Sequence, residues 1–356
     1  MEIQNYLDNA LERLFLNKTE LGYWDDSENR IIESLHHDEE WNWNYKSSKN
    51  YRYSLFCMGM LLLSKEIYGL NTDKYDDKIK KFLVTIKLNK RKFSNTDLTY
   101  GALLSLILGK KIYGLDLIDE ETKSLFFKNL EGLLNTTDNQ NFLLLIAAKY
   151  FQQIYASEKI VELINKVQKR IIKSLHKKFY FDTGDFRAAY HQRIMYTLWG
   201  LIFSSPFDNS EEIRNIANGI INFIYENRRL EDNSFIFHPP IYSINYHGIR
   251  IPVLSLRSSK YLYACHQTFF VNAINFYRYF YKEEKAFEKE KNHAMEWIWG
   301  KNRNNKNLIE VTGIHLPPRF MNLDGNHFLA KENFKGSYEI GSYILSLSEI
   351  VFSSKD

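Results

Sequence analysis

Residues 190–203 read YHQRIMYTLWGLIF, a polar and aromatic opening followed by an apolar run. Apolar side chains at three-and-four spacing predict a helix, and a run this apolar predicts that the helix is buried. Similar openings recur at Tyr51-Arg52-Tyr53, Asp97-Leu98-Thr99-Tyr100, Asn139-Gln140-Asn141, Cys265-His266-Gln267 and Ser337-Tyr338-Glu339. The recurrence predicts a helical toroid with a functional funnel at one end.

Helical spacing extends over most of the chain. It predicts helices near residues 2–17, 51–69, 74–90, 96–113, 119–135, 140–156, 158–176, 187–204, 209–227, 258–282, 284–299 and 337–352. Alternate helices, beginning with the second, are the more apolar ones, as expected for an inner ring surrounded by amphipathic partners. Hairpins closed in a circle predict an all-α fold, an (α/α)6 toroid of about twelve helices with short strand-like loop insertions.

Short-range signals mark several helix ends. Gly69 and Gly114 lie where a left-handed residue helps to end a helix. The N-cap candidates are Asn95, Asp97, Asp119, Ser157 and Ser210.

Three irregular segments interrupt the helices, at residues 18–50, 228–257 and 300–336. Long loops in a folded domain are usually functional or disordered, and the aromatic, His and Arg content of these favours function. Arg319 is one substrate-binding candidate from the third segment. Aromatic candidates, which would either stack on sugar rings or pack in the core, are Trp41, Trp43, Tyr242, Tyr246 and Trp299.

Composition bounds the class of protein. The 356 residues contain no Pro-, Gly- and Ser-rich linker, which predicts one helical toroid domain over residues 1–356. The net charge of +4 is dispersed over outer helix faces, so we expect no nucleic-acid partner. Cys57 and Cys265 both lie in helical patterns, which argues against a disulfide scaffold and favours a reducing compartment.

The sequence favours a cytoplasmic location. The N-terminal stretch MEIQNYLDNALERLF lacks the pattern of a signal peptide. The most apolar run, FLLLIAAKYF, is too short to span a bilayer. Metal-site spacings such as HxxxH, CxxC and HExxH are absent, as are the common phosphate-binding and esterase motifs, so we expect neither a metal nor a cofactor.

In a closed ring the inner helices run in the same direction, so their N-terminal ends surround one mouth. Helix N-termini offer free N–H groups and partial positive charge, which favours an anionic ligand. The mouth is expected to carry Tyr51, Arg52, Asp97, Tyr100, Tyr190, His191, Arg193, His266, Gln267 and Glu339.

Each candidate also has a structural interpretation. His191 and His266 are either catalytic or satisfied core residues. Arg193, and by the same logic Arg52, requires either a structural carboxylate or a bound anion as partner. Glu339 lies in an apolar segment, where it either pairs with Arg52 or Arg193 or takes part in acid–base chemistry.

The remaining carboxylates favour capping. Asp97 is more readily an N-cap or hydrogen-bonding anchor than a general acid. Asp182 and Asp185 stand in the turn FDTGDF, and whether they cap a helix or act in catalysis stays open. Asp324 in MNLDGNH is more readily a turn residue than a catalytic one.

The alternating hairpins, together with WIWGKN at 297–302 and GSYEIGSY at 336–343, resemble the six-hairpin toroid superfamily of carbohydrate-active proteins. That superfamily includes glycoside hydrolases, polysaccharide lyases and sugar epimerases. The resemblance implies an enzyme acting on an acidic saccharide or glycoconjugate as a lyase, epimerase or hydrolase. It leaves the sugar, synthesis versus degradation, and the oligomeric state open.

The resemblance to the toroidal lyases of this superfamily, which act on uronic-acid polymers, also implies roles for particular residues. Arg193, Asn272 and Arg52 would neutralise a substrate carboxylate, while Tyr190, His191, Tyr246 and His266 would act as base or acid. A hydrolase would instead use two carboxylates, for which Asp97, Asp185 and Glu339 are available.

Two other functions remain open. Toroidal terpene cyclases share the helical architecture, and the aromatic interior would stabilise carbocations, but the DxDD motif and repeated QxxxGxW segments are missing. A non-catalytic glycan-binding protein would hold aromatic and Arg side chains without an acid–base pair.

Overall fold

The chain folds into two units, each with buried helices covered by amphipathic ones. Unit 1 comprises Met1–Leu125, Lys306–Arg319 and Phe328–Asp356, and unit 2 comprises Phe126–Asn305 and Phe320–His327. The computed structural model describes residues 2–37, 43–45, 51–136, 138–175, 191–207, 210–236, 241–246, 249–254, 261–310, 314–322 and 334–353.

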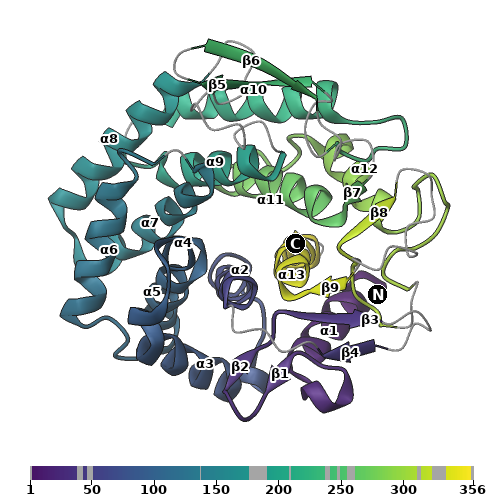
Figure 1. The fold of residues 1–356 in the computed structure, drawn as a ribbon, viewed down its shortest axis with the longest axis horizontal. Coiled ribbons are helices and arrows are strands. Elements are labelled where there is room, and N and C mark those ends of the chain that lie inside the picture. The colour runs from purple at the N-terminus through teal and green to yellow at the C-terminus, as the bar shows by residue number, and fades with distance from the viewer. Residues whose placement is uncertain are drawn as a thin grey trace. The chain divides into compact units, whose positions relative to one another are not determined.

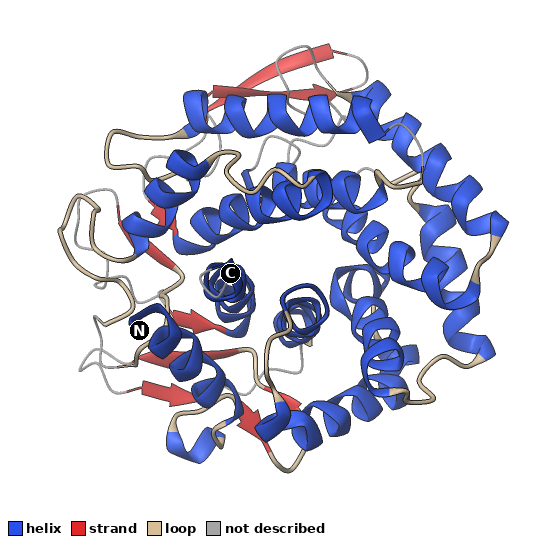
Figure 2. Cartoon of the chain, turned by 180° about the vertical axis from the view of Figure 1, so that it is seen from behind, coloured by secondary structure: helices blue, strands red, loops and turns tan. Residues whose placement is uncertain are grey.

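The helices of unit 1 follow the expected apolar pattern. They are α1 (Glu2–Phe15), η1 (Lys18–Glu20), α2 (Arg52–Tyr68), η2 (Asp73–Tyr75), α3 (Asp76–Asn89), η3 (Lys90–Lys92), α4 (Asn95–Asp97), the π-helix η4 (Leu98–Ala102), α5 (Leu103–Tyr113) and α13 (Ser337–Ser353). Most residues of α2 and α13 and all residues of η4 are buried, because these helices are mainly apolar. Helices α2 and α13 lie side by side (Figures 1 and 2).

Short strands complete unit 1. Strand β1 (Trp24–Asp25) pairs with β2 (Arg30–Ile31), and β3 (Ser34–His37) lies between β4 (Trp43–Tyr45) and β9 (Phe334–Gly336) in an antiparallel sheet. These strands fall in two of the segments that the sequence marks as irregular.

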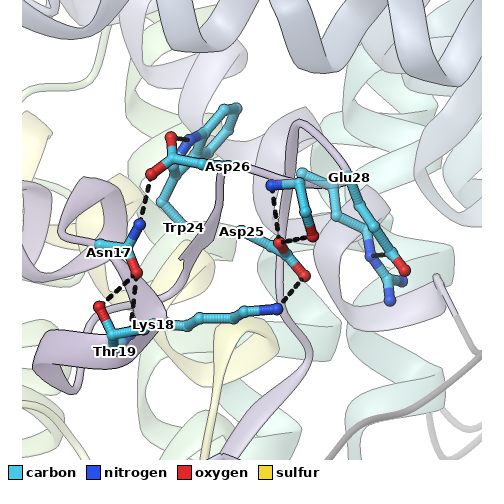
Figure 3. A network of polar contacts seen from close by, with 9 residues as sticks. Asn17, Lys18, Thr19, Trp24, Asp25, Asp26 and Glu28 are labelled. Carbon is cyan, nitrogen blue, oxygen red and sulfur yellow. Dashed lines mark hydrogen bonds and ion pairs between the residues drawn. The ribbon is translucent and has the colours of Figure 1, made fainter.

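A polar network fixes the turn around β1 (Figure 3). Asp25 Oδ2 accepts a 2.7 Å bond from Lys18 Nζ, and its Oδ1 accepts bonds from the backbone and hydroxyl of Ser27. Trp24 Nε1 donates to Asp26 Oδ1 at 2.7 Å. The buried Trp24 therefore keeps its indole N–H satisfied while its ring packs in the core.

Unit 2 repeats the arrangement of buried and covering helices. Its helices are η5 (Asn139–Leu143), α7 (Leu144–Tyr155), α8 (Glu158–Ser174), α9 (His191–Ser204), α10 (Ser210–Arg228), α11 (Ala264–Tyr281) and α12 (Glu288–Ile298), while α6 (Glu120–Gly132) contains the boundary between the units. Strands β5 (Ile241–Tyr246) and β6 (Ile249–Leu254) form a hairpin, and β7 (Tyr261–Tyr263) pairs with β8 (Phe320–Asn322).

Aromatic side chains pack the buried helices of unit 2 together. The Trp199 ring of α9 lies edge-on to Phe269 and Phe276 of α11, at centroid distances of 5.1 and 5.5 Å. Near the other end of α11, Lys149 Nζ of α7 lies 3.7 Å from the centroid of the Phe280 ring. This cation–π contact links α7 to the C-terminal part of α11.

Most helix predictions are confirmed to within a few residues, but three local assignments are wrong. The helix expected from residue 258 begins at Ala264, because Tyr261–Tyr263 pair with β8 instead. Ser94, not Asn95 or Asp97, is the N-cap of α4, and Ser210 is the first residue of α10. Gly69 and Gly114 adopt left-handed conformations at helix ends, as expected.

The remaining cap expectations have mixed outcomes. Asp119 Oδ1 accepts a 2.8 Å bond from the Thr122 amide at the start of α6, as an N-cap does. Ser157 is at the N-cap position of α8 but makes no side-chain capping bond.

In the described part of the chain, every helix is too short or too polar to cross a lipid bilayer.

Close backbone approach explains Gly200 in α9. A Cβ atom at this position would overlap the carbonyl oxygen of Phe142 in η5, so only glycine lets the two segments approach so closely. We expect Gly200→Ala to lower the free energy of unfolding by about 1–3 kcal/mol, as overpacking does. Urea unfolding followed by tryptophan fluorescence measures the change.

Gly132 provides the matched control. Apart from its chain neighbours and the backbone of its own helix, no heavy atom of a described residue lies within 4 Å of a Cβ built at this helical glycine. Gly132→Ala should therefore leave stability unchanged or raise it by up to about 1 kcal/mol. Equal effects of the two substitutions would contradict the close approach at Gly200.

Candidate functional site

In unit 1 the starts of three buried helices carry polar groups. Asp97, at the third position of α4, forms a capping box: Ser94 Oγ accepts from the Asp97 amide, and Asp97 Oδ2 accepts from Ser94. Asp97 Oδ1 accepts a 3.2 Å bond from Arg52 Nε of α2. Asp97 is thus a hydrogen-bonding anchor, as expected, and its ion pair links α2 to α4.

Aromatic rings pack beside this ion pair. The Tyr100 ring of η4 stacks on Phe56 of α2 at 4.9 Å and on Tyr338 of α13 at 5.9 Å. Tyr53 of α2 also contacts Tyr338, at 5.4 Å. The starts of α2, η4 and α13 are therefore joined through one aromatic cluster, in which Tyr100 and Tyr338 are both buried.

Glu33 fixes two of these helix starts. Its carbonyl oxygen accepts from the Ser337 amide at 2.8 Å, at the first residue of α13. Its Oε1 accepts from the Tyr53 amide at 3.3 Å, in the first turn of α2. One residue thus satisfies free N–H groups of two helices, a role that the sequence pattern did not reveal.

Glu339 lies in the first turn of α13 and is 3% exposed. Burial raises the pKa of Glu339 to about 7, although the Arg319 charge and a hydrogen bond of its own backbone oppose the shift. Its Oε2 has no hydrogen-bond partner among the described residues. The expected pairing with Arg52 or Arg193 is not what the structure records, because Arg52 pairs with Asp97 and Arg193 with Asp138.

In unit 2 a second Arg–Asp pair joins two buried helices. Asp138 is the N-cap of η5, where its Oδ1 accepts a 3.0 Å bond from the Gln140 amide. The same carboxylate forms an ion pair with Nη1 of Arg193 in the first turn of α9. The Asp138 side chain is 25% exposed and that of Arg193 is 11% exposed, so the pair lies at the edge of the solvent.

His191 is the first residue of α9, two residues before Arg193. It is completely buried between Phe235 and His266, at ring distances of 5.1 and 4.8 Å. Its Nε2 lies 3.1 Å from the carbonyl oxygen of His266, which only accepts, so Nε2 must carry the proton. Burial lowers the pKa of His191 far below its usual range, as do the charges of His266 and Arg228.

The other candidates in unit 2 lie on α11. His266, Gln267 and Asn272 are buried, and Gln267 Nε2 donates to the carbonyl of Asn233 at 3.3 Å. Gln267 is therefore tied to the turn after α10, while Asn272 lies two turns into the helix.

Several candidates lie outside the described residues, namely Tyr190, Trp41, Asp182, Asp185 and Asp324. Trp43 is in β4, and Tyr242 and Tyr246 are in β5, but their side chains are not described. Trp299 is described and follows the end of α12, and Arg319 precedes β8.

Asp138 was missed because the predicted helix opening began one residue later, at Asn139. The signal was present, since Asp is a favoured N-cap before an apolar run.

Among the described residues, no group of three His, Cys, Asp or Glu side chains could hold a metal ion.

The fold matches solved structures over nearly the whole chain. An unsaturated glucuronyl hydrolase specific for heparin gives a TM-score of 0.68 at 11% identity, covering 99% of this chain and 98% of that one. An unsaturated glucuronyl hydrolase from Bacillus, responsible for the degradation of glycosaminoglycan, gives 0.63 at 11% identity, with coverages of 97% and 96%.

A third structure is an inactive α-1,6-mannanase variant from Salegentibacter in complex with α-1,6-mannotetrose. Its TM-score is 0.62 at 10% identity, with coverages of 99% and 100%. No protein-family model and no curated protein sequence matches the chain.

These proteins are (α/α)6 toroid glycoside hydrolases. The chain therefore has the (α/α)6 toroid fold of these structures, and the predicted all-α architecture is confirmed.

The raised pKa of Glu339 predicts a pH-dependent stability. Between the ordinary pKa of a glutamate and about 7, the folded state keeps a proton that the unfolded state has lost. Stability should therefore fall as pH rises through this window and level off above it. Glu339→Gln should remove this part of the slope, which urea unfolding at a series of pH values measures.

Glu66→Gln is the matched control, because Glu66 is a partly exposed glutamate of α2 that pairs with Lys111. It should keep the wild-type slope. A Glu339→Gln variant whose stability depends on pH as the wild type does would show that Glu339 is ionised in the folded protein throughout the window.

Proposed function

We propose that this chain is a carbohydrate-active hydrolase that acts on an acidic saccharide. The observation that carries the proposal is the ion pair between Asp138 and Arg193 at the starts of two neighbouring buried helices. Glycoside hydrolysis ordinarily uses a pair of carboxyl groups, one of which transfers a proton at the scissile bond, and Asp138 would be that one. Asp138 is partly exposed, so a substrate can reach it.

The fold favours this chemistry. The two glucuronyl hydrolases and the mannanase described above share it over nearly their full lengths. Fold alone does not determine function, so the residues at the site must carry the argument.

Asp138 and Arg193 would have different roles, proton transfer and substrate binding. Asp138 would take a proton from the attacking water or give one to the leaving oxygen. Arg193 uses Nη1 to hold Asp138 and its Nε is buried, so the N–H donors of Nη2 would remain for a substrate carboxylate. The N-terminus of η5 adds partial positive charge, which also favours an acidic sugar.

We assign the proton transfer to Asp138 in preference to His191. The His191 ring is fully buried, and its Nε2 proton is committed to the carbonyl of His266. Its role would be to hold the starts of α9 and α11 together.

In unit 1, Arg52 is more exposed than Asp97, its ion-pair partner, with 39% of its side chain exposed. We propose Arg52 as a separate contact for an anionic group.

A panel of saccharides tests the reaction class. In an unsaturated uronic acid the double bond is conjugated with the carboxylate and absorbs ultraviolet light. Water cleaves the glycosidic bond, the ring of the released unsaturated sugar opens, and its enol tautomerises to a keto acid. The conjugated double bond and its absorbance are thereby lost, and we expect this loss with unsaturated uronic disaccharides. A gain of absorbance with saturated uronic polymers would instead identify a lyase and contradict the proposal.

Neutral α-1,6-mannan oligosaccharides form a second arm of the panel. Cleavage of these alone would keep the hydrolase and overturn the acidic substrate class. Turnover in neither arm would contradict the proposed function.

Substitution tests the assigned pair. Asp138→Asn should lower kcat/KM about 100- to 10,000-fold, the usual contribution of a general acid or base. Arg193→Met should raise KM for acidic substrates, because it removes the cation that would bind their carboxylate. Steady-state kinetics on the best substrate of the panel measure both effects.

Glu283→Gln is the control, because Glu283 forms an ion pair with Arg214 beyond the C-terminal end of α11. Its kinetics should match those of the wild type. An Asp138→Asn variant with wild-type turnover would exclude Asp138 from the chemistry.

A further inference from the structure

We infer that Arg170, on the covering helix α8, is a positioning residue that holds the segment presenting Asp138. This inference rests on the proposed function for its catalytic consequence. The physical link runs through three residues of unit 2, each joined to the next by recorded hydrogen bonds.

The first link joins Arg170 to the end of α6. Arg170 Nη1 donates to the carbonyl oxygen of Leu133 at 2.7 Å, and Nη2 donates to the carbonyl oxygen of Thr136. Carbonyl groups beyond a helix C-terminus lack helical partners and attract cations. Arg170 therefore supplies donors and charge where α6 ends.

The second link joins Thr136 to Asp138. Thr136 Oγ1 accepts from the Asp138 amide at 3.2 Å and from Asn141 Nδ2 at 2.8 Å. The backbone of Asp138 is thereby tied to the residue whose carbonyl Arg170 holds. The Asp138 carboxylate then continues the chain of contacts to Arg193.

A third contact strengthens the hold of Arg170. Its guanidinium lies 5.9 Å from the ring centroid of Phe142, in η5. Arg170 thus contacts residues on both sides of Asp138. Burial lowers the pKa of Arg170, but an arginine stays charged at neutral pH, so its donors are permanent.

A positioning role predicts an effect on kcat through Asp138. Arg170→Met keeps an apolar stem near Phe142 and removes the donors. We expect kcat to fall about 10- to 100-fold, since a displacement of about 1 Å in a catalytic group has effects of this size. KM should change little, and Arg170→Lys should recover part of the loss. In the Asp138→Asn background Arg170→Met should cost no further activity.

Hydrogen exchange tests the positioning without any substrate. Amides of residues 134–143 should exchange faster in Arg170→Met than in the wild type, while those of α11 should not. Thr136→Val removes the next link and leaves α8 unchanged, so it should speed exchange of the same segment even if Arg170→Met folds poorly. Lys166→Met is the control, since Lys166 lies one turn earlier on α8 and pairs at the surface with Glu162.

Three results would overturn the inference. One is wild-type exchange of residues 134–143 in Arg170→Met and Thr136→Val. Another is a loss of kcat as large in the Asp138→Asn background as in the wild type. A third is an equal loss in Lys166→Met. A wild type that turns over no saccharide would refute the proposed function instead, and the exchange experiment would still decide whether Arg170 holds the segment.

Discussion

The candidate site in unit 2 depends on one ion pair, between Asp138 before α7 and Arg193 on α9. Charges that lose much of their water are stable only when paired, so this contact requires the two helix starts to stay in register. Close packing of η5 against Gly200 provides that register. Unit 1 contains a pair of the same kind, Arg52 with Asp97, beside an aromatic cluster that joins its own helix starts.

The helical architecture could be predicted from the sequence because buried and covering helices differ in how apolar residues are distributed around the helix. Helix α2 is apolar on nearly all faces, whereas α8 buries only a stripe that includes Ile160, Ile164 and Ile171. The start of α11 could not be located in this way. Tyr261–Tyr263 continue the apolar pattern of the helix, and their pairing with β8 depends on residues far away in the chain.

The site was predicted in part. A polar opening marked Arg193, and its need for a buried partner was foreseen from charge alone. The identity of that partner was not, because Asp138 precedes it by 55 residues and no local signal links them. The contribution of Arg170 was hidden for a similar reason, since it acts on backbone carbonyls, which leave no trace in sequence. For Glu339 the sequence left open either pairing with Arg52 or Arg193 or acid–base chemistry, and the structure shows a buried carboxyl group with a raised pKa.

The most direct test of the Asp138–Arg193 site is a crystal structure of the Asp138→Asn variant with an unsaturated uronic disaccharide. We expect the sugar carboxylate to contact Arg193 and the glycosidic oxygen to lie within hydrogen-bonding distance of residue 138. A disaccharide bound away from both residues would contradict it.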